Sequence, residues 1–157
     1  MSTVTLEQIQ AEHQRLATLI AQFSAQTSAL QSRQILIEEE EIDLEPGEHY
    51  AGLVLNDDGA PSHHLILLPG EAEKITWGDA IDWADQAGGS LPSRREQALL
   101  YANCKGEFRE AWYWSGEEHT TDGAYAWSQY FGYGNQYLSR KSYEGRARAV
   151  RLIPLSA

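Results

Sequence analysis

A segment near the carboxyl end carries the side chains best suited to binding chemistry. From Gly132 to Arg148 the chain reads GYGNQYLSRKSYEGRAR, with three tyrosines, three glycines, two serines and a single leucine. Tyr, Ser, Gly and Asn are enriched in antibody paratopes, because tyrosine gives rigid amphipathic contact and the small residues give adaptable hydrogen bonds. We therefore expect a recognition surface made by Tyr130, Tyr133, Asn135, Tyr137, Ser139, Arg140 and Tyr143.

The alternative for this segment is structural. If its tyrosines alternate along strands, half of them face the core, and Gly132 and Gly134 are then only turn residues. The tryptophans Trp112, Trp114 and Trp127 are expected in the core, since large aromatic side chains dominate core burial.

Residues capable of covalent catalysis are scattered. Cys104 is the chain's one cysteine, and His119 would reach it only through a tertiary contact. A lone cysteine at a helix end is usually a small buried hydrophobe. The sequence has no P-loop, dinucleotide-binding glycine motif, HExxH or GxSxG. We predict no catalytic residues and no enzyme activity.

Metal ligands are not grouped either. His63 and His64 are neighbours in a predicted strand and point to opposite faces, so one metal is poorly placed to bind both. Asp79, Asp82 and Asp85 are spread along a predicted helix in a way that suits solvent. We predict no metal site and no cofactor.

The first 30 residues have the clearest periodicity. Mostly apolar residues recur at spacings of three and four, the heptad pattern of a coiled coil, at Leu6, Ile9, His13, Leu16, Ile20, Phe23, Thr27 and Leu30. The helix begins at a capping box formed by Thr5 and Gln8. Only Leu19 widens the stripe, and so narrow a stripe favours self-association. We predict a homo-oligomer, trimer favoured over dimer; the alternative is one amphipathic helix lying on its own domain.

Strands and helices follow in blocks. We predict a strand from residue 34 to the Pro46-Gly47 turn, then strands in 50–59 and 63–70. Helices follow Thr76 and Ser93, the second with a Ser93–Glu96 capping box. Strands are then expected in 112–116, 124–131, 135–140 and 146–155. This order predicts an α+β fold, divided into an oligomerising helix (1–33), an antiparallel strand meander (34–73) and a domain (74–157) with two helices and antiparallel sheets.

Charge is uneven along the chain. The formal net charge is −11, and residues 36–90 contain fourteen acidic residues and one lysine. An acidic middle opposes direct binding to nucleic-acid phosphates, and we expect none. It is either a solvated surface or, alternatively, an acidic face that mimics nucleic acid. No run approaches the roughly 18 apolar residues of a spanning helix, and no secretory signal is visible, so we expect no membrane partner and synthesis in the cytoplasm, with virion association left open.

Several motifs resemble a known family. LPSRREQALL, WYWSGEE, AYAW and AVRLI, in this order over residues 74–153, resemble the C-type-lectin-like domain of Lcl-type collagen-like adhesins, which also occurs in phage and prophage proteins of unknown function. The resemblance implies that Leu91, Pro92 and Ser93 open the second helix. It also implies that core strands hold Tyr113, Trp114, Ser115, Trp127, Val150 and Arg151. Variable proteins of diversity-generating retroelements and formylglycine-generating enzymes are implied as distant kin.

Two departures from these relatives narrow the expected chemistry. The Glu-Pro-Asn or Gln-Pro-Asp triplet of calcium-dependent lectins is missing, so no structural calcium is expected. The cysteine pair of formylglycine-generating enzymes is also missing.

The residues and the resemblance together predict a non-enzymatic, oligomeric binding protein of phage or prophage type. Its Tyr-rich surface would meet a host protein or glycan, and several copies on one stalk would add avidity. One alternative is an acidic intracellular inhibitor of a host defence or nucleic-acid-binding protein. Another is a structural virion component whose main contacts are to copies of itself.

Overall fold

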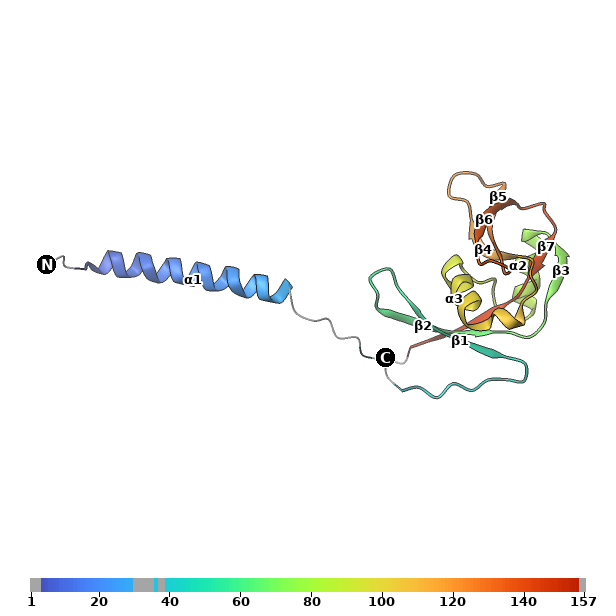
Figure 1. The fold of residues 1–157 in the computed structure, drawn as a ribbon, viewed down its shortest axis with the longest axis horizontal. Coiled ribbons are helices and arrows are strands. Elements are labelled where there is room, and N and C mark those ends of the chain that lie inside the picture. The colour runs from blue at the N-terminus through green and yellow to red at the C-terminus, as the bar shows by residue number, and fades with distance from the viewer. Residues whose placement is uncertain (1–3, 30–35, 37–38, 156–157) are drawn as a thin grey trace. The chain divides into compact units, whose positions relative to one another are not determined.

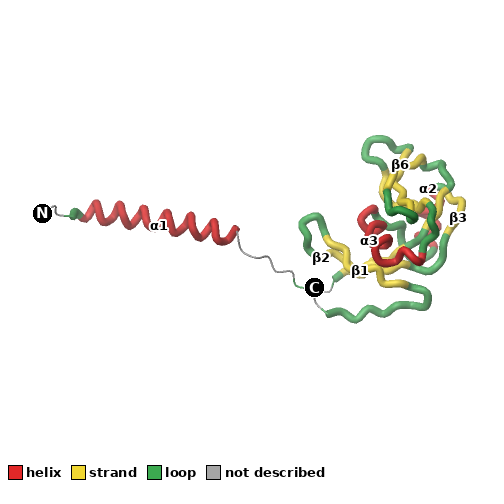
Figure 2. The backbone as a smooth tube through the Cα atoms, in the orientation of Figure 1, coloured by secondary structure: helices red, strands yellow, loops and turns green. Residues whose placement is uncertain are grey.

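The chain forms two units, Met1–Leu36 and Ile37–Ala157 (Figures 1 and 2). The structure, a computed structural model, describes residues 4–29, 36 and 39–155. In the first unit, helix α1 spans Leu6–Ala29. The predicted capping box is present, since Thr5 N donates to Gln8 Oε1 at 3.0 Å and Gln8 N donates to Thr5 Oγ1 at 3.3 Å. The predicted N-terminal helix is confirmed, and Leu30 lies outside the described residues.

The heptad side chains of α1 are open to solvent within this chain. Leu6, Ile9, Leu16, Ile20 and Phe23 are between 56% and 70% exposed, and His13 is exposed as well. An apolar stripe of this kind has no packing partner inside its own helix.

One sheet of the second unit has three antiparallel strands in the order β1-β2-β8, namely β1 (His49–Leu55), β2 (Pro61–Leu67) and β8 (Val150–Pro154). The prediction of a strand beginning at residue 34 is wrong over the described positions 36 and 39–45, which belong to no strand. Side chains anchor that segment instead. Arg151 Nη2 donates to Asp43 O at 3.0 Å, and His64 Nε2 lies 3.0 Å from Glu40 Oε2.

The other sheet has five strands in the order β3-β7-β4-β5-β6. They are β3 (Ala72–Ile75), β4 (Trp112–Glu118), β5 (Tyr125–Tyr130), β6 (Gln136–Arg140) and β7 (Gly145–Ala147). The pair β4–β7 is parallel, so this sheet is mixed where antiparallel pairing was predicted. The strand predicted over 146–155 is two strands, β7 and β8, which belong to different sheets.

Two helices lie between these strand groups in sequence, as predicted. They are α2 (Trp77–Gln86) and α3 (Arg94–Cys104), and a short 3-10 turn, η1 (Lys105–Glu107), follows. Ser93 and Glu96 form the predicted capping box. Thr76 occupies the N-cap position of α2, but its hydroxyl donates to the Asp79 carboxylate at 2.9 Å and accepts from no backbone N–H of the helix. Trp77 N donates to Lys141 O at 3.1 Å instead.

The core consists of two apolar clusters. In the first, α3 packs between the three-stranded sheet and β4–β5 (Figure 1), burying Ala51, Val54, Leu65, Leu67, Leu100, Cys104, Tyr113, Phe131 and Val150. In the second, α2 packs on the five-stranded sheet, burying Leu68, Trp77, Ala80, Ala84, Leu91, Trp114, Ala126, Ala147 and Ala149. The fold is α+β, as predicted. Among the described helices, none is long and apolar enough to cross a membrane.

Candidate ligand-binding site

Aromatic side chains gather on one face of β4, β5 and β6. Trp112 is the register partner of Tyr130, and Ser128 is the register partner of both Trp114 and Tyr137. Because alternate residues of a strand share a face, Trp112, Tyr130 and Tyr137 lie on the same side of the sheet. The Trp112 ring centroid lies 5.3 Å from that of Tyr130 and 5.7 Å from that of Tyr137, and Tyr130 lies 5.5 Å from Tyr133. We call Trp112, Tyr130, Tyr133, Tyr137 and Tyr143 the aromatic face.

The outer rings of the aromatic face are open to solvent. Tyr133 is 83% exposed, Tyr137 59% and Tyr143 50%, whereas Tyr130 and Trp112 are half-buried. Within the described residues, the hydroxyls of these three exposed tyrosines form no hydrogen bond to the protein. The core therefore does not explain why rings of this size are placed here.

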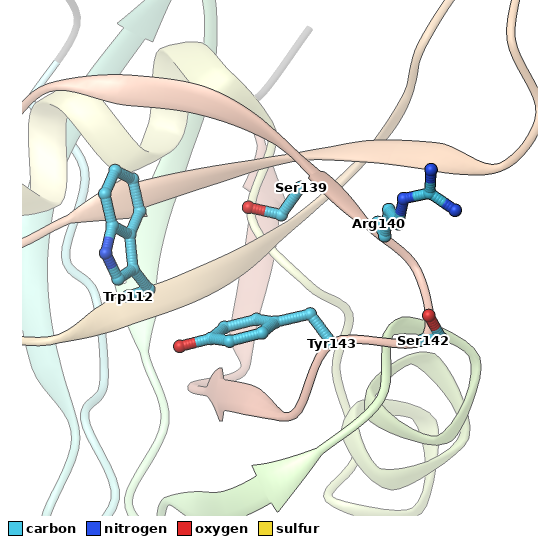
Figure 3. Close-up of a pocket in the computed structure, with 5 residues that line it drawn as sticks. All are labelled: Trp112, Ser139, Arg140, Ser142 and Tyr143. Carbon is cyan, nitrogen blue, oxygen red and sulfur yellow. The ribbon is translucent and has the colours of Figure 1, made fainter.

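A hollow of about 550 Å³ opens beside the aromatic face (Figure 3) and is lined by Trp112, Ser139, Arg140, Ser142 and Tyr143. In Figure 3 the rings of Trp112 and Tyr143 border the hollow, the Ser139 hydroxyl points between them, and the Arg140 guanidinium is directed away from the rings. The volume is within the range of small-molecule sites, and aromatic walls with few polar groups are typical of such sites.

The elements beneath the hollow hold its walls in place. Tyr143 N donates to Arg140 O at 2.8 Å, which closes the turn that carries Ser142. The Tyr143 ring meets the buried Trp114 edge-on with centroids 6.4 Å apart. Trp114 Nε1 in turn donates to Ile75 O at 3.0 Å. The Tyr143 wall is thus supported through the core strand β4.

A polar layer supports the sheet from its other side. Gln129 Nε2 donates to Gln97 O at 2.9 Å, and Gln136 Nε2 donates to Arg94 O at 2.7 Å. The Arg94 guanidinium also lies 3.5 Å over the Trp127 ring. These contacts connect α3 to β5 and β6 directly behind the aromatic face.

The structure brings most of the predicted site residues together. Ser139, Arg140 and Tyr143 line the hollow, and Tyr130, Tyr133 and Tyr137 lie on the adjoining aromatic face. Asn135 is exposed in the turn before β6 and is not among the residues that line this hollow; its backbone carbonyl accepts from Tyr130 N at 2.9 Å.

Sequence reasoning missed Trp112, which was expected in the core. It is the first residue of β4 and is only half-buried, while Trp114, two residues further on, is buried under α2 and β3. The polar residues Arg109 and Glu110 just before this strand were the available signal that it begins at the edge of the core.

The catalytic candidates remain apart. Cys104 is buried, and burial raises the pKa of its thiol above the usual value, which disfavours the reactive thiolate. His119 instead accepts a hydrogen bond from Asp122 N at its Nδ1, at 2.9 Å. Cys104, the last residue of α3, is therefore a member of the first core cluster.

The two neighbouring histidines have separate partners. His63 Nε2 lies 2.8 Å from Glu96 Oε1, and His64 bridges Glu40 and the Tyr50 hydroxyl. Ser62, His63 and Glu96 form a row resembling a hydrolase triad, but Glu96 also caps α3, so the row connects β2 to that helix. Across residues 4–29, 36 and 39–155, no group of three His, Cys, Asp or Glu is placed to hold a metal ion.

No protein-family model and no curated protein matches this chain.

Proposed function

We propose that this chain is a non-enzymatic binding protein of phage or prophage type, which presents its aromatic face to a host protein or glycan. The observation that carries the proposal is the exposure of Tyr133, Tyr137 and Tyr143 beside the 550 Å³ hollow. Tyrosine and tryptophan dominate binding hot spots, because they bury large areas at low conformational cost.

The scaffold around the aromatic face supports recognition better than turnover. The walls of the hollow lie on strands and a closed turn, and hydrogen bonds to α3 brace the sheet from behind. A preformed surface loses little entropy on binding. Ser139, which lines the hollow, has its hydroxyl 3.0 Å from that of Ser128, and the five residues named above as lining the hollow include no His, Asp, Glu or Lys that could activate it.

The resemblance to C-type-lectin-like domains supports the proposal through the placement of its motifs. Trp114 and Ser115 are buried on β4, Trp127 lies on β5, and Val150 begins β8. These are positions that the resemblance implies for its core strands. A lectin-like binding module would also account for a ligand site without catalytic groups.

Self-association through α1 is the second part of the proposal. Its exposed heptad stripe fits a parallel coiled coil, and a trimer is favoured over a dimer. Copies joined by α1 would bind a multivalent surface with an affinity well above that of one site.

An acidic inhibitor of a host defence or nucleic-acid-binding protein is the second candidate. The observation in its favour is the row of exposed carboxylates at Glu39, Glu41, Asp43 and Glu45, in a segment outside both sheets. Capture of such a partner by charge must weaken steeply as salt rises, whereas capture by the aromatic face must persist. A structural virion component is a third candidate, and it predicts binding only to copies of this chain.

The test is binding to immobilised bacterial surface glycans and envelope proteins by the whole chain and by the double variant Tyr133→Ala, Tyr137→Ala. We expect the variant to lose at least about tenfold in affinity, the effect of removing hot-spot aromatics. The matched control is Leu55→Ala, Leu152→Ala, which removes residues exposed to 42% and 44% on the other sheet. Equal loss in both variants, or none in either, would overturn the proposal.

A further inference from the structure

A second hollow, of about 280 Å³, adjoins the first. The two hollows share Trp112 and Tyr143 in their linings, and the second adds Tyr130 as a third aromatic wall. Its acidic lining includes Glu110 and Glu144. We call this space the acidic hollow, defined by Trp112, Tyr130, Tyr143, Glu110 and Glu144.

The charges around the acidic hollow are unequally satisfied. Arg146 also lines it, but its guanidinium is held by Glu73 at 2.6 Å and by Glu71 at 3.1 Å. The exposed carboxylates of Glu110 and Glu144 form no hydrogen bond or ion pair with the part of the chain that the structure describes. Against these two negative charges stands one lining cation without an ion-pair partner in the same described residues, Lys74.

We propose that the acidic hollow binds an organic ammonium group, either a lysine side chain or a quaternary ammonium headgroup. A cation near the faces of Trp and Tyr rings is attracted by their quadrupoles, and recognition of ammonium groups by aromatic walls is an established use of this force. Two nearby carboxylates add Coulomb attraction.

The chemistry of the walls favours an organic cation over a metal ion. Calcium takes six to eight oxygen ligands and magnesium a near-ideal octahedron. This hollow is lined by three carboxylates and three rings, and one of the carboxylates, Glu73, is already held by Arg146. This inference rests on one part of the proposed function, namely that a ligand binds at the aromatic face. A ligand that spans both hollows would then carry its ammonium group beside an uncharged polar part.

The test uses small probes on the full chain, followed by NMR on the indole N–H of Trp112, which Trp112→Phe assigns. The probes are choline and a lysine blocked at both backbone ends. Their matched controls are the uncharged choline isostere with carbon in place of nitrogen, and the same blocked lysine acetylated on Nζ. We expect saturable shifts for the ammonium probes and roughly tenfold weaker binding of the uncharged ones. Stronger binding of choline than of lysine, or the reverse, identifies the source of the ammonium group.

Charge variants test the same assignment from the protein side. Glu110→Gln with Glu144→Gln should weaken choline binding roughly threefold to tenfold, and Lys74→Gln should strengthen it. Asp82→Asn, on the exposed side of α2, is the matched control and should change nothing. Equal binding of choline and its uncharged isostere, or glutamate variants that bind as the parent does, would overturn the inference.

These outcomes separate the inference from the proposed function. If the tyrosine variants lose the host ligand but choline and its uncharged isostere bind equally well, only the assignment of the acidic hollow is wrong. If choline binds through charge while the tyrosine variants keep the host ligand, only the proposed function fails.

Discussion

The side-chain amide of Gln136 donates a hydrogen bond of 2.8 Å to Gln129 Oε1, between directly paired positions of β6 and β5. Gln129 is fully buried and itself donates to the Gln97 carbonyl of α3. The strands that carry the aromatic face are therefore tied to α3 by a chain of amides. Buried networks of this kind are rigid when every member is paired.

The first prediction concerns this network. Gln129→Ala should lower the free energy of unfolding by roughly 1 to 3 kcal/mol, because it removes the hydrogen bonds of the Gln129 amide to Gln97 O and from Gln136 Nε2 at a fully buried position. Urea unfolding followed by circular dichroism measures the change. Gln86→Ala, at the exposed end of α2, is the control and should stay within about 0.5 kcal/mol of the parent. A similar result for both variants would show that the amide chain does not brace the sheet.

Features fixed by neighbouring residues could be predicted from the sequence. The capping boxes at Thr5–Gln8 and Ser93–Glu96 join residues three apart, so their patterns are local, and both are present. The exposed tyrosines of the predicted site follow from composition. The number of tyrosines that face solvent could not be predicted, because the alternation of residues along a strand does not show which face of the sheet a helix will cover.

The features that depend on distant residues were not predictable. The chain crosses from one sheet to the other at Arg148 and Ala149, where the buried Arg148 guanidinium donates to the carbonyl of Leu68 at 3.0 Å and to that of Glu107 at 2.5 Å. In sequence this region reads as one alternating strand. The exposure of Trp112 likewise depends on where α2 stops covering the sheet.

The second prediction separates contact from core among the aromatic residues. Tyr133→Ala should cost at most about 1 kcal/mol of stability, because its ring is exposed and lies beside the half-buried ring of Tyr130. Phe131→Ala, two residues earlier, should cost about 3 to 5 kcal/mol, since that ring is buried and stacked on Phe108 at 3.8 Å. Thermal melting of both variants gives the comparison. A large loss in Tyr133→Ala would mean that the ring serves the fold.

The third prediction addresses α1. Ile20→Glu places a charge on the heptad stripe and should convert the proposed oligomer to a monomer, because a charge at a buried seam position of a coiled coil is costly. Ala11→Glu puts the same charge on the opposite side of the helix and should leave the mass unchanged. Sedimentation equilibrium reports the mass of each. A monomer for the parent chain at micromolar concentration would remove the avidity argument.

The fourth prediction is that the free energy of unfolding depends on pH through the titration of the Tyr113 phenol. Burial, followed by its hydrogen bond to Glu71, raises the pKa of this phenol to about 12. An unfolded tyrosine titrates near 10, so between these values the folded chain keeps a proton that the unfolded chain releases. The stabilisation is complete below pH 10 and is lost as pH rises toward 12. Urea unfolding at pH 8 and pH 11 should show a loss of about 1 kcal/mol from this residue.

Tyr113→Phe isolates that contribution, since the other groups that titrate in this range are common to both proteins. The variant should be less stable at pH 8, because Arg109 N loses an acceptor at 3.0 Å and the Glu71 carboxylate loses a donor. Its stability should then fall less steeply than that of the parent, so that the two curves converge toward pH 11. Curves that stay parallel over this range would mean that the Tyr113 phenol titrates as it does in the unfolded chain, and that Glu71 does not hold its proton.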